Sequence, residues 1–191
     1  MKDEREILTR AIVQQKLIRK EKRDIIGNAL LLLLGAFVYG FMFLLLLIPS
    51  WDAKLFLIFV AIPFALLSII PIIHIIKGCV KLGKARRGAF SVTEDSLSKM
   101  EDFKFSFWKF LLRFDMRTPV MSFINKPYYE HVFQFESGKK FVIDAYEYEN
   151  THMGTVAQFS QMGDKLIVAF YNDTPERIVL LFSPKIYHYK A

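Results

Sequence analysis

The pair of side chains that most resembles a catalytic arrangement is His131 and Asp144. They lie in two β-rich segments, residues 128–136 and 139–148, which Ser137-Gly138 joins as a predicted two-residue hairpin loop. In that register His131 faces Asp144, and a carboxylate can orient an imidazole for proton transfer. Because no nucleophile can be placed beside this pair, we interpret it as structural.

Other catalytic and metal-binding patterns are missing from the sequence. The four histidines show no spacing such as HExxH, and a single cysteine cannot form a cysteine-rich zinc module. GxSxG, P-loop and GxGxxG motifs do not occur either. We therefore expect a protein that is not an enzyme and that holds neither a cofactor nor a metal.

The net charge of +7 is unevenly distributed along the chain. Residues 1–28 contribute +3 and residues 77–88 contribute +5, whereas residues 89–191 carry −1. A nucleic-acid-binding protein would be expected to carry its basic residues on the folded module. The positive excess instead flanks an apolar middle, so nucleic acid is not an expected partner.

Two apolar stretches predict a transmembrane hairpin. Residues 29–48 contain no charge, and neither do residues 55–76; a helix of about 20 residues covers the roughly 30 Å core of a bilayer. The connecting residues 49–54 are short and contain Trp51. Since nearly all nearby Lys and Arg residues lie on the side of the termini, both termini are predicted to be cytoplasmic in a multi-pass protein of the cell membrane.

Two basic segments flank this hairpin. Residues 1–28 read as an amphipathic helix, either solvated or lying on the inner leaflet. Residues 77–88 form a basic linker that is both a common topology signal and a candidate lipid-binding segment, at about 1 kcal/mol per cation near an anionic surface. Its candidate residues are Lys77, Lys81, Lys84, Arg86 and Arg87.

A segment rich in phenylalanine, residues 103–114, is the third candidate membrane-surface element. Its periodicity fits either a helix or a strand at its start. Such a basic, aromatic segment is costly to leave in water, so we expect it to contact the bilayer or the cytoplasmic end of the hairpin, or to close over the soluble domain. The candidate residues are Phe103, Phe107, Trp108, Phe110 and Phe114.

Residues 89–191 predict a small cytoplasmic β domain. Strand-like runs occupy residues 90–93, 165–171, 177–182 and 186–189, in addition to the hairpin described above, and Glu94-Asp95 is a predicted turn. The expected fold class is therefore membrane α+β. In it, a two-helix transmembrane hairpin precedes a small antiparallel β-barrel-like domain of the OB or SH3-like class, with a split PH-like barrel as the alternative.

Several short motifs carry a family resemblance. Phe90-Ser-Val-Thr-Glu-Asp95 is similar to the first strand of YcxB-like and bacterial PH-like membrane proteins. Together with Gly138-Lys-Lys-Phe141 and Met162-Gly-Asp-Lys-Leu-Ile-Val168, the chain resembles uncharacterised small bacterial membrane proteins that have two transmembrane helices and a C-terminal cytoplasmic β domain. This resemblance implies the architecture and no particular site residues.

From these patterns we expect a non-enzymatic integral membrane protein that presents its β module for protein interaction or scaffolding. The alternative is a regulatory or accessory subunit that senses the anionic lipid surface through the basic and phenylalanine-rich segments. The expected partners are the lipid bilayer, a membrane or cytoplasmic protein of unknown identity, and as a further candidate a second copy of the chain.

Overall fold

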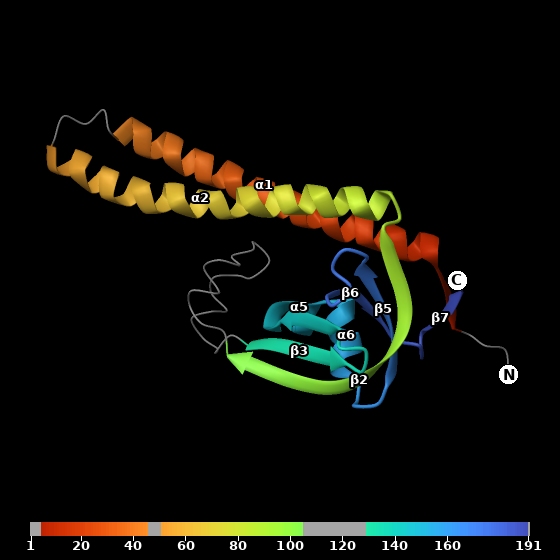
Figure 1. The fold of residues 1–191 in the computed structure, drawn as a ribbon. Helices are drawn as coiled ribbons and strands as arrows, with labels where there is room; N and C mark the ends of the chain where they lie inside the picture. The colour runs from red at the N-terminus through yellow and green to blue at the C-terminus, as the bar shows by residue number, and fades with distance from the viewer. Residues whose placement is uncertain (1–4, 46–50, 105–128, 191) are drawn as a thin grey trace.

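Two long helices dominate the first half of the computed structural model, which describes residues 5–45, 51–104 and 129–190 of the chain. These helices, α1 (Arg10–Leu45) and α2 (Trp51–Arg86), each contain 36 residues. They lie side by side in opposite directions (Figure 1). At about 1.5 Å per residue each is roughly 54 Å long, which is much longer than a bilayer core is thick. Each helix therefore has a part beyond the predicted span.

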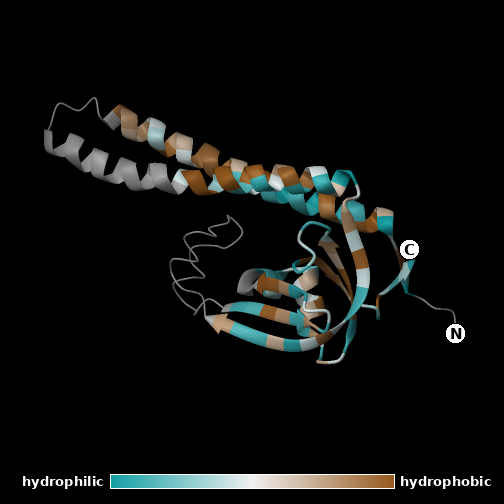
Figure 2. Cartoon of the chain, viewed as in Figure 1, coloured by the Kyte–Doolittle hydropathy of each residue, from teal (hydrophilic) through white to brown (hydrophobic). Residues whose placement is uncertain are grey.

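One helix among the described residues, Arg10–Leu44, is long and apolar enough to cross a membrane. Only 6% of its apolar stretch is buried inside the protein, whereas the core helix of a soluble protein is mostly buried. Figure 2 shows apolar residues along this part of α1 and on the neighbouring part of α2. The second predicted span, residues 55–76, lies within α2, but the side chains of residues 55–67 lie outside the described part.

The rest of the chain forms a curled, five-stranded antiparallel sheet, which agrees with the predicted β domain at this level. Its order is β4-β3-β2-β5-β6. The strands are β2 (Phe90–Lys104), β3 (Tyr129–Phe135), β4 (Lys140–Asp144), β5 (Lys165–Tyr171) and β6 (Ile178–Phe182). The sheet lies beside one half of the helical hairpin (Figure 1).

Strand β2 is long because both of its halves find partners. Residues 90–96 pair with β5 and residues 97–104 pair with β3. The predicted turn at Glu94-Asp95 is therefore wrong. The Asp95 carboxylate accepts a hydrogen bond from the Ser137 hydroxyl and lies 3.7 Å from the Lys139 ammonium, so it holds the β3–β4 loop while the strand continues through it.

The register of the β3–β4 hairpin differs by one residue from the predicted register. His131 pairs with Ile143, and Asp144 pairs with Glu130. A two-residue type I′ loop would require positive φ at both central residues, but of the two only Gly138 has positive φ, at 81°. The loop therefore contains three residues. This one-residue change exchanges the two faces of β4 and turns Ile143 into the core.

Two short helices occupy the interval between β4 and β5. They are α5 (Ala145–Asn150) and α6 (His152–Gln158), so the predicted strand over residues 139–148 is wrong beyond Asp144. Thr151 is the N-cap of α6, since its hydroxyl accepts a hydrogen bond from the Gly154 N–H at 3.1 Å. Helix α6 contributes Val156 and Ala157 to a core with side chains from all five strands of the sheet.

A second core lies on the other face of β5, where the N-terminal region covers it. Strand β1 (Glu6–Thr9) pairs in parallel with β7 (Tyr187–Lys190), so the helix predicted for residues 1–28 is wrong at residues 6–9. Helix α1 then begins at Arg10 and continues without a break into the apolar stretch. Leu8, Val13 and Leu17 are completely buried and belong to the same cluster as Ile167, Ala169 and Tyr171 of β5.

One buried polar contact joins α1 to the sheet. The Tyr171 hydroxyl donates a hydrogen bond of 3.0 Å to Glu21, whose side chain lies in the same interface and is 3% exposed as a residue. Burial and the neighbouring Glu21 carboxylate raise the pKa of Tyr171, so the phenol stays protonated and remains a donor. The N-terminal half of α1 is therefore an integral part of the β domain.

Candidate functional site

The five cations of the predicted basic linker lie on different faces of the end of α2. Lys77, Lys81 and Lys84 follow the i, i+4, i+7 spacing that places residues on one helical face. Arg86, two residues beyond Lys84, lies on the opposite face, and it and Arg87 are exposed. The linker therefore does not present its charges as a single surface.

Lys84 is neutralised within the protein. Its ammonium lies 2.5 Å from the Asp173 carboxylate, which belongs to the turn between β5 and β6. This ion pair lowers the pKa of Asp173. Because the pair joins α2 to the sheet, Lys84 is better explained as a structural contact than as a lipid ligand.

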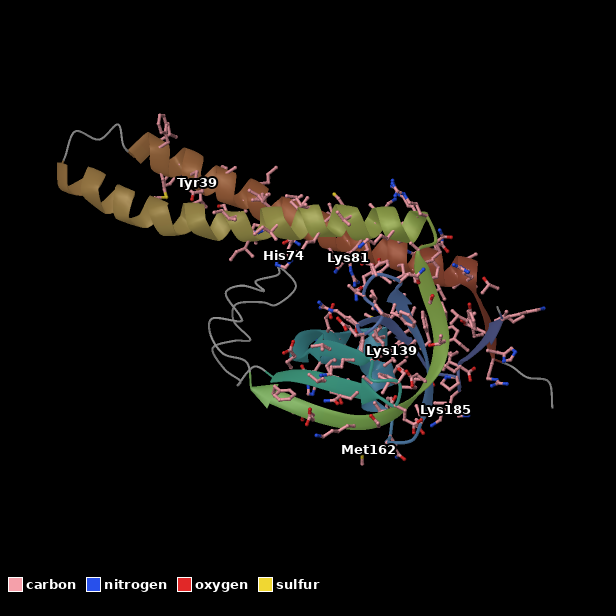
Figure 3. All side chains as sticks on the ribbon, viewed as in Figure 1. Tyr39, His74, Lys81, Lys139, Met162 and Lys185 are labelled. Atoms are coloured by element: carbon pink, nitrogen blue, oxygen red, sulfur yellow. The ribbon has the colours of Figure 1, made fainter. Side chains whose placement is uncertain are left out.

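Lys81 has a very different environment. It points from α2 toward the β domain (Figure 3) and is half-buried there. Burial lowers the pKa of Lys81; the Glu21 carboxylate opposes this shift, and Arg177, Lys20 and Lys77 reinforce it. Three further cations and one acid thus lie close enough to Lys81 to influence its charge. Arg177 and Lys20 are part of this cluster although the sequence did not suggest them.

The phenylalanine-rich segment is described only at its start. Phe103 belongs to β2, pairs with Glu130 and is 47% exposed. Phe107, Trp108, Phe110 and Phe114 lie outside the described residues.

His131 has a carboxylate partner, but this partner is Asp102 rather than the predicted Asp144. The Nδ1 atom of His131 lies 2.7 Å from Oδ1 of Asp102 on the neighbouring strand β2. Its ring also stacks on Tyr148, with ring centroids 4.0 Å apart. Burial, with the Asp102 carboxylate nearby, raises the pKa of Tyr148, which keeps that phenol neutral. The arrangement ties α5 to the inner strands β2 and β3.

No metal site is found in the described ranges. Nowhere in residues 5–45, 51–104 and 129–190 do three or more His, Cys, Asp or Glu side chains come together in a way that could hold a metal ion. Cys79, which lies among the linker cations, is a free and exposed thiol.

A groove of about 340 Å³ lies at the end of the β domain formed by α6 and the loop between β6 and β7. Its wall includes Phe159, which is 75% exposed, and Ile186, which is 44% exposed. Met162 in the adjoining turn is 72% exposed. Met162 and Lys185 lie on the side of the β domain opposite the helices (Figure 3). Exposed large apolar side chains around a groove are typical of an interaction surface.

The charged residues of this groove are mainly basic. Lys165 and Lys185 are exposed at its border, and His152 also lines it. The one acid in its wall is Asp164, whose carboxylate accepts a hydrogen bond of 3.0 Å from the Gln161 N–H. The groove thus combines apolar anchors with a positive rim.

The sequence contained a signal for this groove that periodicity alone did not reveal. Phe159 and Met162 both lie in the turns that lead to Gly163, at positions where polar residues are the usual choice. Because the groove also needs Lys185 and Ile186 from a loop more than 20 residues away, its shape follows from tertiary contacts.

Comparison of the chain with models of protein families, with curated proteins and with solved structures finds no match.

Proposed function

We propose that the chain is an integral membrane protein with two spans and cytoplasmic termini, which presents its β domain for interaction with another protein and is not an enzyme. The observation that carries the interaction role is the exposed apolar groove formed by Phe159 and Ile186 on the side of the domain opposite the helices. The absence of a match leaves this proposal to rest on the geometry.

Membrane insertion is supported by the outer surface of the hairpin. On α1, Leu33, Phe37 and Phe43 are each at least 67% exposed, and on α2, Ile69 and Ile76 are 49% and 59% exposed. In water this continuous apolar surface would be unfavourable by about 25 cal/mol per Å². Hydrocarbon removes that penalty, so a bilayer is the environment in which this surface is stable.

Cysteine labelling tests the two-span topology. The chain has one cysteine, Cys79, so a Cys79→Ser background is free of thiols. In that background, a Ser50→Cys variant should react with a membrane-impermeant maleimide in intact cells, because we place the loop between the helices outside. A Lys190→Cys variant should react only after lysis. Labelling of position 190 in intact cells would overturn the proposed orientation.

For the β domain we propose an OB-like, partly open barrel. An OB-fold has five strands in a Greek-key arrangement, and the sheet here also has five strands. Its two edges approach each other, since the Lys140 N–H donates a hydrogen bond of 2.7 Å to the Glu176 carbonyl and Lys140 forms a parallel bridge with Arg177. This contact at the edges, with Val156 and Ala157 of α6 in the core that the sheet curls around, supports a barrel over an open sheet.

The occupant that we propose for the groove is an apolar segment of a partner protein that also carries acidic residues. Phe159 and Ile186 offer apolar contact area, and exposed aromatic side chains are common anchors at interfaces. Lys165 and Lys185 at the rim outnumber Asp164, the one acid in the wall. Complementary rim charges of this kind favour an acidic partner.

Site-specific photo-crosslinking tests this surface in cells. A photoreactive amino acid at position 159 should give one discrete protein adduct, whereas the same amino acid at Met100, which is 39% exposed on β2, should not. Lys185→Glu should weaken the adduct by about fivefold, since one rim charge contributes roughly 1 kcal/mol. Lys190→Glu, a charge reversal of another exposed lysine, is the matched control.

Three outcomes would contradict the proposed occupant. Equal adducts at positions 159 and 100 would mean that contact is nonspecific. Equal weakening by Lys185→Glu and Lys190→Glu would mean that the local rim charge does not select the partner. An adduct that consists of a second copy of this chain would replace the proposed partner with a homo-oligomer.

A second candidate function is sensing of the anionic membrane surface. It is favoured by the half-buried Lys81 and the cations that surround it at the end of the apolar surface. Lys84, which is paired with Asp173, does not contribute to it.

A further inference from the structure

The two walls of the groove belong to two different cores. The first wall is formed by α6 and the residues after it, and its Val156 lies in the core inside the curled sheet. The second wall, residues 183–186, leads directly into Tyr187, which lies in the core on the other face of β5 together with Leu8 of β1. The shape of the groove therefore depends on how these two packed parts of the domain are placed relative to each other.

The N-terminal region holds the second wall in place. The Glu6 N–H donates a hydrogen bond of 2.9 Å to the Ile186 carbonyl. The Arg5 guanidinium donates one of 3.4 Å to the Pro184 carbonyl. A further hydrogen bond of 3.1 Å, from the Ile186 N–H to the Ser183 carbonyl, closes the turn itself. Because β1 pairs with β7 and leads directly into α1 (Figure 1), the position of the second wall follows from the position of the N-terminal region.

Tyr187 connects the second wall to both α1 and the first wall. It is 8% exposed, and its hydroxyl accepts a hydrogen bond of 3.3 Å from the Lys16 ammonium of α1. A lysine can only donate, so the hydroxyl proton is available to Nε2 of His152, which lies 3.4 Å away and lines the first wall. The Lys16 ammonium also lies 4.8 Å from the centre of the Tyr187 ring and 5.1 Å from that of Phe182, which is within the range of cation–π attraction.

These contacts make the groove dependent on α1. We propose that docking of β1 and α1 on the sheet positions the second wall of the groove, with Lys16 and Tyr187 as positioning residues, so that the acidic, apolar partner segment binds tightly only when α1 is docked. This inference rests on the proposed function of the groove and adds its regulation. Since α1 continues without a break into the apolar stretch, the groove is coupled to the helix that we place in the membrane.

Thermodynamic linkage makes this coupling reciprocal. If docking of α1 raises the affinity of the groove for a partner segment, a bound partner stabilises the docked position of α1 by the same factor. A single hydrogen-bonding or charged contact within such a coupling should contribute about fivefold. Loss of the Lys16–Tyr187 contact should therefore loosen the second wall and weaken partner binding to a similar extent.

The first measurement needs no partner. Hydrogen exchange of the full chain in detergent, followed by mass spectrometry of peptides that contain residues 183–190, reports the local stability of the second wall. Tyr187→Phe removes one hydroxyl and keeps the buried ring, and it should accelerate exchange in these peptides about fivefold. Lys16→Met removes the ammonium and keeps an unbranched apolar side chain, and its effect should be similar.

Two matched variants control this measurement. Tyr189→Phe removes the same atom from the same strand, where the hydroxyl makes no hydrogen bond with the described residues. Lys22→Met removes the same charge from an exposed position of α1. Both should change the exchange rate by less than about twofold. Exchange that is equally fast in Tyr187→Phe and Tyr189→Phe, or unchanged in both Tyr187→Phe and Lys16→Met, overturns the positioning role.

The second measurement uses the photoreactive amino acid at position 159 in cells. The discrete adduct should weaken about fivefold in Tyr187→Phe and Lys16→Met, and less than about twofold in Tyr189→Phe and Lys22→Met. An undiminished adduct in variants whose second wall exchanges faster overturns the coupling. If the wild-type chain gives no discrete adduct, the proposed function of the groove fails and the coupling with it, whereas the exchange measurement still decides whether α1 positions the wall.

Circular dichroism of each variant checks the fold. If Lys16→Met loses its helix signal, Tyr187→Phe decides alone, because it removes one oxygen atom from a buried ring and is expected to leave the fold intact. Lys16→Arg keeps a donor and a positive charge beside the two rings and should exchange like the wild-type chain. Exchange in Lys16→Arg as fast as in Lys16→Met overturns the role of this charge.

Discussion

Replacing Gly154 with alanine is expected to lower the free energy of unfolding by about 3 kcal/mol, because α5 and α6 would have to separate. A Cβ atom at this position would lie 2.1 Å from the carbonyl oxygen of Tyr148 and 2.4 Å from that of Glu147. Both atoms belong to the backbone and cannot rotate away. For a chain of this size, the loss corresponds to a decrease of about 6–12 °C in the unfolding temperature.

Thermal unfolding of the full chain in detergent, followed by circular dichroism, measures this effect. The matched control is Gly83→Ala in α2, where a Cβ atom would meet nothing within 4 Å. There the greater helix propensity of alanine should leave stability unchanged or raise it by up to about 1 kcal/mol. Equal unfolding temperatures for Gly154→Ala and the wild-type chain would contradict the close approach of α6 to the end of α5.

Leu17→Ala is expected to have a similarly large effect, a loss of about 2–5 kcal/mol, because it leaves a cavity between α1 and the sheet. Leu17 is completely buried in the core that also contains Ile167 of β5. Hydrogen exchange of the β5 amides in the detergent-solubilised chain measures this loss directly, since these amides should exchange faster once the helix packs poorly against the strand.

Leu33→Ala provides the control for this substitution. Leu33 lies on the same helix and loses the same atoms, but it is 70% exposed on the apolar outer surface. Its substitution should therefore leave exchange at β5 nearly unchanged. If Leu17→Ala and Leu33→Ala changed hydrogen exchange at β5 equally, the N-terminal half of α1 would not belong to the β domain.

The sequence predicted those elements whose signal is local. Strand β5 appeared at Lys165–Tyr171 as predicted, and the Met162-Gly163-Asp164 turn precedes it. Its run of uninterrupted apolar residues indicates a strand covered on both faces. The sequence did not say that α6 covers one face and α1 the other, because that pairing joins segments far apart in the chain.

The sequence-based predictions were wrong where a local residue pattern is compatible with two structures. Residues 145–148 continue the β-rich composition of β4, yet they form α5 because the chain must turn to bring α6 into the core. The sequence of the hairpin loop is compatible with two or three loop residues. The loop has three, because only Gly138 of the two central residues has positive φ. With that choice His131 moved away from Asp144, and the contact with Asp102 required the third strand β2.

The same distinction applies to the positive charge. The sequence by itself determined that the cations flank the apolar stretch, because composition and order along the chain are local properties. Only the tertiary structure decided which cations act together: it paired Lys84 with Asp173, left Arg86 exposed, and brought Lys20 and Arg177 to Lys81. The physical reason is that electrostatic interaction depends on distance through space, and folding sets the distance between residues as far apart in the chain as Lys20 and Arg177.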